Sequence, residues 1–180
     1  SAVVSAFEEV SGRSFAVDPK IHQGLMVEKA EANGIHSGRT VRGPKKRPKA
    51  LFNYQRLINN DIEPGVVEDL RTVVVGPHVA LVYRKRRVLS RRFESGEASA
   101  EIVMADNVFT KGEQELIISF ARRIGLDFGE IDILRNKTDG KIYCVDVNTT
   151  SALPPVTMSF SEIRRALSII ADAFKQAFLT

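Results

Sequence analysis

The stretch that decides the fold of this chain runs from Gly129 to Thr150 and reads GEIDILRNKTDGKIYCVDVNTT. Apolar and polar residues alternate on both sides of the turn-forming residue Gly140, which is the pattern of a half-buried β-hairpin. The polar positions include Asp132 on the first strand, and Asp146 and Asn148 on the second. Two carboxylates and an amide oxygen make a ligand set that suits a hard cation.

The strand register decides whether these three side chains meet. A two-residue turn at Asp139-Gly140 pairs Asp132 with Val147, and the two carboxylates then lie on opposite faces of the sheet. A separate alternative to the cation site is that Asp146 and Asn148 only cap the loop that follows the second strand.

A longer turn gives the other register. A three-residue loop, 138–140, needs a residue with a left-handed backbone at its end, and a glycine stands there. This loop pairs Lys137 with Lys141 and places Asp132 opposite Asp146, with the amide side chain two residues further on the same face. We favour this register, because the shorter turn leaves Asp146 isolated on an apolar strand.

Size and composition limit the class of protein. With 180 residues, of which 43% are hydrophobic, the chain can form one sizeable core or two small lobes that share a site. No apolar run approaches the roughly 20 residues that span a bilayer, and the first residues do not resemble a secretory signal. The single cysteine, Cys144, excludes an intrachain disulfide and a cysteine zinc cluster. It fits a cytoplasmic protein, and its place in an apolar strand indicates packing.

The formal net charge of +4 is concentrated in two clusters, 45–49 and 84–92. We interpret the first cluster, KKRPK, as a solvated loop, because its lysines and prolines have no evident aromatic partners. Two basic clusters also leave open a nucleic-acid-binding domain as an alternative function.

The hydrophobic pattern predicts antiparallel strands interleaved with helices, which is an α+β fold. The predicted strands cover 14–17, 25–28, 39–42, 66–75 and 79–86, in addition to the hairpin described above, and 50–58 is apolar with a polar insertion. The pair 66–75 and 79–86 forms a second hairpin across Gly76-Pro77. Neither a GxGxxG fingerprint nor a P-loop is present.

Three helices are predicted. The first covers 2–10, and the second begins at the capping box of Thr110 and Glu113. The third begins at the capping box of Ser159 and Glu162. Its predicted buried face consists of Ile163, Leu167, Ile170, Phe174 and Phe178.

The order of these pieces resembles the ATP-grasp superfamily, which includes glutathione synthetase, D-alanine–D-alanine ligase and the ribosomal-protein glutamate ligases. The resemblance spans roughly residues 12–158 and depends on an ordered set of segments: MVEKAEANGIHSG, YQRLINN, VVEDLRTVVVG, VALVYRKRR, and GEIDILRN with CVDVNTT. It implies an ATP-grasp fold, in which two small α+β lobes with antiparallel sheets hold ATP between them. The small lid lobe would cover about 12–52 and the larger metal-binding lobe 53–180. The lobe that usually precedes this unit would be absent.

The resemblance also implies residues that hold the nucleotide. Lys29 matches the lysine that touches the phosphates, and Asn33 to Gly38 resembles the loop that closes over them, with His36 as a further candidate. A carboxylate after the adenine strand, Asp61 or Glu63, would hold the ribose. The strand whose backbone receives the adenine edge matches Gln55, Arg56, Leu57 and Ile58. The alternatives are a lysine that solvates a strand end and an ordinary buried strand.

The segment Asp69-Leu70-Arg71 resembles the D-x-R strand of the superfamily. A two-residue Gly-Pro turn in the second hairpin sets Asp69 opposite Arg84, and Arg71 opposite Val82. Arg71, Arg84 and Arg86 then line one face as catalytic residues that stabilise charge on the transferred phosphoryl group. The alternative is a surface ladder of cross-strand ion pairs.

Asp132, Asp146 and Asn148 match the magnesium ligands of the superfamily. Many members have glutamate where this chain has Asp146, so the number or position of the ions is open. Oxygen ligands suit Mg²⁺, with Mn²⁺ as an alternative ion, and they disfavour zinc.

The resemblance therefore implies an ATP- and Mg²⁺-dependent ligase. Such an enzyme activates the carboxylate of a small molecule or peptide as an acylphosphate, which an amine or thiol then attacks. An ATP-grasp small-molecule kinase is the enzymatic alternative, and a basic nucleic-acid-binding domain is the non-enzymatic one. We expect neither a membrane nor a nucleic acid as a partner. Without a preceding lobe, the isolated chain would lack part of the substrate site and full activity.

Overall fold

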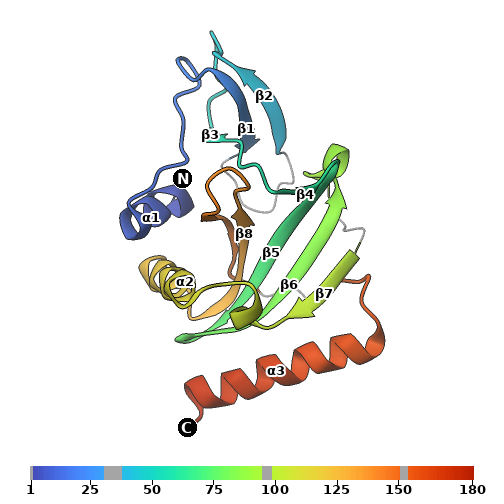
Figure 1. Cartoon of the computed structure of the whole chain (residues 1–180). Helices are drawn as coiled ribbons and strands as arrows, with labels where there is room; N and C mark the ends of the chain where they lie inside the picture. The colour runs from blue at the N-terminus through green and yellow to red at the C-terminus, as the bar shows by residue number, and fades with distance from the viewer. Residues whose placement is uncertain (1, 31–37, 95–98, 151–153) are drawn as a thin grey trace.

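The computed structural model describes residues 2–30, 38–94, 99–150 and 154–180. These residues form an α+β fold with two antiparallel sheets, as the sequence predicts (Figure 1). The smaller sheet has the strand order β2-β1-β3 and consists of β1 (Gly24–Ala30), β2 (Arg39–Gly43) and β3 (Phe52–Arg56).

The larger sheet has the order β7-β6-β5-β8-β9, and a short strand, β4, pairs with β5 outside this path. Its strands are β4 (Asp61–Glu63), β5 (Val66–Val75), β6 (His78–Val88), β7 (Ser99–Val103), β8 (Phe128–Arg135) and β9 (Ile142–Asn148). Two short 3₁₀ turns, Leu89–Arg91 and Ala105–Asn107, flank β7.

The boundary between the sheets differs from the expected one. β3 pairs with β1, so residues 53–56 belong to the smaller sheet and not to the larger lobe in which we placed them. The predicted strand at 14–17 is also wrong, because it makes only one isolated bridge, between Ala16 and Gln55. A division of the chain into a lid lobe and a metal-binding lobe remains a prediction, with the change of sheet near residue 57.

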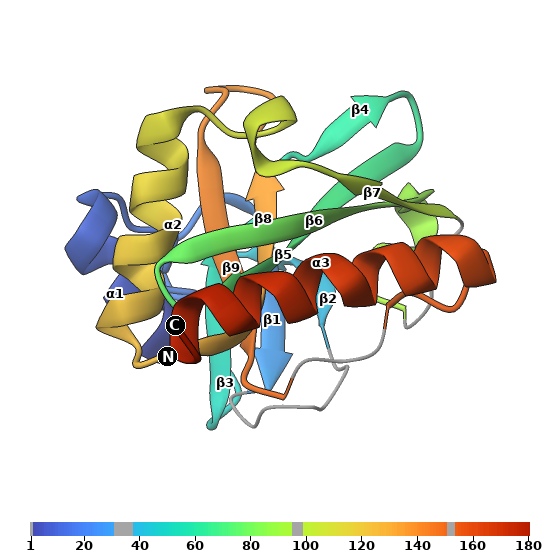
Figure 2. The same ribbon diagram turned by 90° about the horizontal axis from the view of Figure 1, so that it is seen from below.

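The helices begin where the capping boxes predict. α1 is Ala2–Ser11, α2 is Lys111–Arg123 and α3 is Phe160–Phe178, and both predicted capping boxes are formed. Figures 1 and 2 show that α1 and α2 cover one face of the larger sheet, while α3 runs across the other. No helix in the described part of the chain is both long enough and apolar enough to cross a bilayer.

The predicted buried face of α3 is only partly right, because Ile163 and Ile170 pack on the larger sheet and the other three residues are more exposed. Leu167, Phe174 and Phe178 are 45%, 39% and 43% exposed, whereas Ala166 is fully buried. The helix packs on β5 and β6 through a stripe one position away, which suits small side chains close to the sheet (Figure 2). The residues of this stripe are Ile163, Ala166, Ile169, Ile170, Ala173 and Ala177.

Cys144 lies in the main core under α1 and α2, as its apolar strand predicts. Burial raises the pKa of its thiol. We therefore expect a thiol reagent at pH 8 to leave the native protein unlabelled and to label one thiol after unfolding in guanidinium, because the thiolate is the reacting species. Rapid labelling of the native protein would contradict this packing.

A buried carboxylate anchors the smaller sheet. Glu28 in β1 is 0% exposed and accepts hydrogen bonds from Tyr54 Oη at 2.8 Å and from Arg39 Nε at 2.8 Å. Lys45 donates to the same carboxylate, and Lys49 Nζ lies 3.4 Å from Glu28 Oε1. This hub joins β1 to β2, to β3 and to the loop between them.

The interpretation of 45–49 as a solvated loop is therefore only partly right. Lys46, Arg47 and Lys49 are exposed, but Lys45 and Lys49 are ion-paired with Glu28, and both have aromatic partners, contrary to the prediction. The ammonium of Lys49 lies 4.6 Å from the ring centre of Phe52, and that of Lys45 lies 5.6 Å from the ring centre of Tyr54. These partners lie in β3, so only the pairing of β3 with β1 brings them near the lysines.

Candidate functional site

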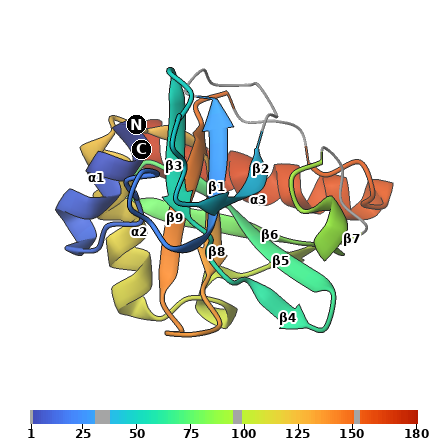
Figure 3. The ribbon, with the colours of Figure 1, turned by 90° about the horizontal axis from the view of Figure 1, so that it is seen from above.

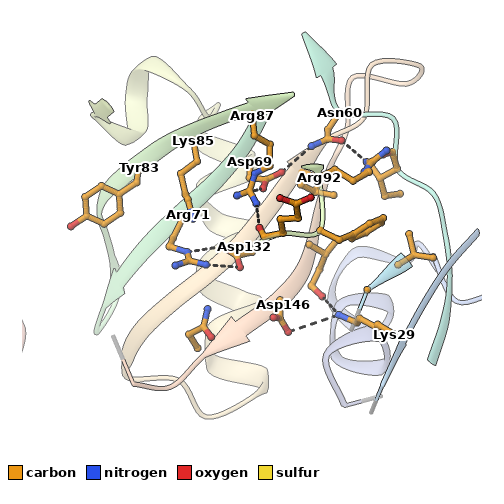
Figure 4. Close-up of a pocket in the computed structure, with 18 of the residues that line it drawn as sticks. Lys29, Asn60, Asp69, Arg71, Tyr83, Lys85, Arg87, Arg92, Asp132 and Asp146 are labelled. Carbon is orange, nitrogen blue, oxygen red and sulfur yellow. Dashed lines mark hydrogen bonds and ion pairs between the residues drawn. The ribbon is translucent and has the colours of Figure 1, made fainter. Parts of the chain in front are cut away.

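A cleft of about 640 Å³ lies between the two sheets, within the usual size range of small-molecule sites. Figure 3 looks down on the smaller sheet with the larger sheet beneath it. Val27 and Lys29 of β1 line the cleft from the smaller sheet, while β5, β6, β8 and β9 supply its polar floor (Figure 4). Such a cleft gives two rigid surfaces for one ligand.

The hairpin of β8 and β9 brings acidic and amide side chains to this floor. Asp132 lies opposite Asp146, which confirms the favoured register, and Glu130 lies opposite Asn148. Asp132, Asp146 and Asn148 all line the cleft. The three predicted metal ligands therefore share one face of one hairpin.

The length of the hairpin loop differs from the prediction. The backbone N–H of Asn136 donates to the carbonyl of Lys141 at 2.9 Å, so the loop covers 137–140 and the expected pair of Lys137 with Lys141 is absent. The register shifts by one residue next to Asp132, through a β-bulge in β9. The bulge compensates for the longer loop and keeps the two carboxylates opposite each other.

The bulge also provides an anchor for the smaller sheet. Val145 is the extra residue, and its carbonyl accepts a hydrogen bond from Lys29 Nζ at 2.9 Å. The same ammonium lies 3.9 Å from Asp146 Oδ1 (Figure 4). Burial raises the pKa of the Asp146 carboxyl, with Lys29 opposing the shift and Asp132 adding to it. The carboxylate of Asp146 is thus only partly compensated by the protein.

Arg71 of β5 neutralises the other carboxylate. It lies opposite Asp132, donating from Nε to Oδ1 at 2.8 Å and from Nη2 to Oδ2 at 3.1 Å. Its Nη1 lies 3.7 Å from Oε2 of Glu130, which is only 1% exposed. Glu130 is not among the predicted site residues, although its position two residues before Asp132 places it on the same face.

The register of β5 with β6 corrects the expected row of arginines. The Gly-Pro turn has two residues, but a shift between Val73 and Val74 moves the remaining pairs by one. Arg71 consequently lies opposite Tyr83, and Asp69 lies opposite Lys85. The predicted partners, Val82 and Arg84, are wrong.

Arg84 and Arg86 accordingly lie on the other face of the sheet and do not line the cleft. The guanidinium of Arg86 donates to Glu68 at 3.1 Å, and that of Arg84 donates to Glu101 at 3.1 Å. These two arginines form the cross-strand ladder of ion pairs that was the alternative interpretation. The prediction that they act as catalytic residues beside Arg71 is therefore wrong.

The same shift brings a second polar cluster into the cleft. Asp69 Oδ1 accepts from Asn60 Nδ2 at 3.0 Å, and Asp69 Oδ2 lies 3.1 Å from Nη2 of Arg87. Arg92 donates to Asn60 Oδ1 at 2.7 Å, and the largely buried Lys85 lines the cleft beside them. The pKa of Asp69 is raised by burial, against the attraction of Arg87. The sequence gave no sign of this cluster, because the bulge decides which face of β6 enters the cleft.

Only some of the residues that were predicted to bind the nucleotide line the cleft. Lys29 and residues 55–58 line the cleft, although β3 ends at Arg56, so only the first two residues of the predicted adenine strand lie in a strand. Asp61 and Glu63 belong to β4 and do not line the cleft. Neither of these two carboxylates is therefore placed to hold a ribose in the cleft. The predicted lid, with His36, lies outside the described residues, apart from Gly38, which lines the cleft.

The donor atoms at the floor fit a hard divalent cation. Within the described residues, no three histidine, cysteine or acidic side chains come together as a metal-binding group. The predicted ligand set consists of two carboxylates, Asp132 and Asp146, with the amide of Asn148 as the third donor. An all-oxygen set of this kind suits Mg²⁺, which retains water or phosphate oxygens at its other positions.

The chain is similar in fold to solved structures of the ATP-grasp ligase PsnB. The complex of PsnB with a minimal precursor is 14% identical, with a TM-score of 0.58 over 97% of this chain and 58% of that one. The complex with the precursor peptide PsnA2 and AMPPNP is 15% identical, with a TM-score of 0.58 over 95% and 58%. The chain thus spans just over half the length of PsnB.

A third PsnB complex contains the minimal precursor, Mg and ADP; it is 14% identical, with a TM-score of 0.58 over 94% of this chain and 56% of that one. No family model matches the chain. No curated protein matches it in sequence. At these identities the likeness is one of fold.

Proposed function

Because the chain has the ATP-grasp fold, we propose that its cleft binds ATP with Mg²⁺ and that the chain is the nucleotide-binding part of an ATP-dependent ligase. One observation carries the proposal. Asp132, Asp146 and Asn148 share one face at the floor of the cleft, and Lys29 reaches the same point from the opposite sheet. A cation site on one side of the cleft and a lysine on the other side suit the binding of a polyphosphate between them.

In this proposal, Asp132, Asp146 and Asn148 would hold Mg²⁺, which supplies charge neutralisation for the β- and γ-phosphates when it is bound. Lys29 would bind phosphate oxygens as a point charge. The backbone from Gln55 to Ile58 would receive the adenine edge, while the side chains shape the slot.

The reaction proposed is the formation of an acylphosphate. A carboxylate oxygen of the acceptor attacks the γ-phosphorus of ATP, and ADP leaves with the electrons of the broken P–O bond. An amine or thiol then adds to the acyl carbon and expels phosphate. The chain contributes positioning and charge stabilisation, with Arg71 as the cleft arginine nearest to the metal ligands. A peptide carboxylate is a reasonable acceptor class, since PsnB is complexed with precursor peptides.

The structure gives no support to the nucleic-acid alternative. Several of the basic residues on which it depended are engaged within the molecule, with Lys45 and Lys49 on Glu28, and Arg84 and Arg86 on Glu68. Basic side chains that are already ion-paired within the protein release fewer counterions when a nucleic acid binds, so they contribute little to its affinity.

Calorimetric titration with AMPPNP, in the presence and absence of Mg²⁺, tests the nucleotide site. We expect binding that requires Mg²⁺ and is at least tenfold weaker without it, because the phosphates and two carboxylates otherwise repel each other. Absence of binding at millimolar AMPPNP with Mg²⁺ would overturn the proposal.

A second assay separates the ligase from the kinase. ATP, Mg²⁺, an acidic peptide and hydroxylamine are incubated with the protein, and an acylphosphate is trapped as a hydroxamate. Formation of the hydroxamate supports the ligase. Phosphorylation of a hydroxyl group without hydroxamate would instead support the small-molecule kinase.

A further inference from the structure

The most specific contact in the cleft joins a cation of the protein to a predicted cation ligand. Arg71 engages both carboxylate oxygens of Asp132, at 2.8 and 3.1 Å, and its third nitrogen faces Glu130 at 3.7 Å. The side chains of Arg71 and Asp132 are only 23% and 21% exposed, so water screens the pair weakly. Figure 4 shows the guanidinium lying directly on the Asp132 carboxylate.

This pairing conflicts with a divalent cation on the same carboxylate. A guanidinium remains charged at every accessible pH, and a two-pronged arginine pair uses one lone pair on each carboxylate oxygen. A cation bound by Asp132 would lie close to that positive group, in a site where repulsion is strong. Metal binding and the Arg71–Asp132 pair therefore compete.

We propose that Arg71 is the internal counter-ion of the metal site, and that it leaves Asp132 when the divalent cation arrives and turns to the anion that accompanies the cation. The inference rests on the proposed function for the identity of that anion, a polyphosphate. A divalent cation that binds alone must displace Arg71 from Asp132, and the guanidinium then gains no new anionic partner. A cation with a polyphosphate gives the guanidinium a new anionic partner, so the two ligands bind cooperatively.

A change at Arg71 should then have opposite effects on the two ligands. In Arg71→Gln, Mn²⁺ alone, followed by electron paramagnetic resonance, should bind about tenfold tighter than in the wild type, because no internal cation competes. The affinity for AMPPNP in the presence of Mn²⁺ should fall, because the polyphosphate loses a partner. A merely structural role for Arg71 would weaken both.

The matched control is Arg84→Gln, which removes a guanidinium from the opposite face of the same sheet. It should leave both affinities unchanged. Equal or weaker binding of Mn²⁺ alone to a folded Arg71→Gln, as judged by its circular dichroism, would overturn the proposal.

The wild type provides a test that does not depend on the stability of the variant. The Nε–H group of Arg71 gives a nuclear magnetic resonance signal that is identified by its loss in Arg71→Lys. This signal should move when Mg²⁺ and AMPPNP are added together, and an unchanged signal at saturation would overturn the proposal. Failure of the wild type to bind AMPPNP at all overturns the proposed function instead, while the Mn²⁺ comparison still decides the role of Arg71.

Discussion

Asp146→Asn is expected to weaken Mg²⁺-dependent AMPPNP binding by about 100-fold, because it removes a charged oxygen ligand and leaves the shape of the side chain unchanged. The fold should survive. Burial raises the pKa of Asp146, which means that the protein disfavours its charged form, so a neutral amide costs little stability. Titration with AMPPNP at fixed Mg²⁺, together with a thermal melt, measures both effects.

Asp61→Asn is the matched control. Asp61 also carries a carboxylate, but it lies in β4 and does not line the cleft. Its replacement should leave the affinity unchanged. Metal-dependent binding that persists at full strength in Asp146→Asn would show that the β8–β9 hairpin is not the metal site.

Glu28→Gln should lower the free energy of unfolding by about 2 kcal/mol, after allowance for solvent around the half-exposed Arg39 and Lys49. The variant leaves several cations gathered around a neutral amide. Chemical denaturation at pH 7 measures the loss. Glu9→Gln, which breaks the exposed ion pair with Arg123, is the control and should have no measurable effect.

The pH dependence of this loss has a definite sign. The pKa of Glu28 is lowered from 4.5 to about 2, because hydrogen bonds and charge from Lys45, Tyr54 and Arg39 outweigh its burial. A carboxyl whose pKa is lower in the folded state stabilises the fold fully above pH 4.5 and loses that effect as the pH falls towards 2. The difference between the wild type and Glu28→Gln should therefore be constant near neutrality and shrink below pH 4.5. A difference that grows in acid would contradict this assignment.

The two hairpins show what local sequence decides and what it leaves open. Alternation and turn glycines predict both hairpins, and the helix caps at Thr110 and Ser159 are formed as predicted. Loop counting places Asp132 opposite Asp146 correctly only because a longer loop and a bulge at Val145 cancel. In the hairpin of β5 and β6 nothing compensates for the register shift, so Arg84 lies on the face opposite to the predicted one. Bulges depend on packing across the whole sheet, so they leave no local signal.

The charged clusters escaped prediction for a related reason. Glu28 sits in an apolar strand, and its cations come from β2 and the following loop. Asp69 contacts Arg87 only through the observed strand pairing, and Asn60 links Asp69 to Arg92. Such clusters are products of the assembled fold, whereas the proposed metal ligands lie on one local hairpin, where alternation places them on a shared face although the loop length and the bulge were not predicted.

Glu28 and Lys29 are neighbours in β1, and their side chains project from opposite faces of the smaller sheet. The outer side chain is fixed by the ion-paired hub, and the inner one reaches across the cleft to Val145 and Asp146. Two adjacent residues of β1 therefore connect the ion-paired cluster around Glu28 to the face of the sheet that lines the cleft. A substitution of Glu28 can therefore displace the side chain of Lys29. Loss of ligand affinity in a Glu28 variant need not mean that Glu28 contacts the ligand.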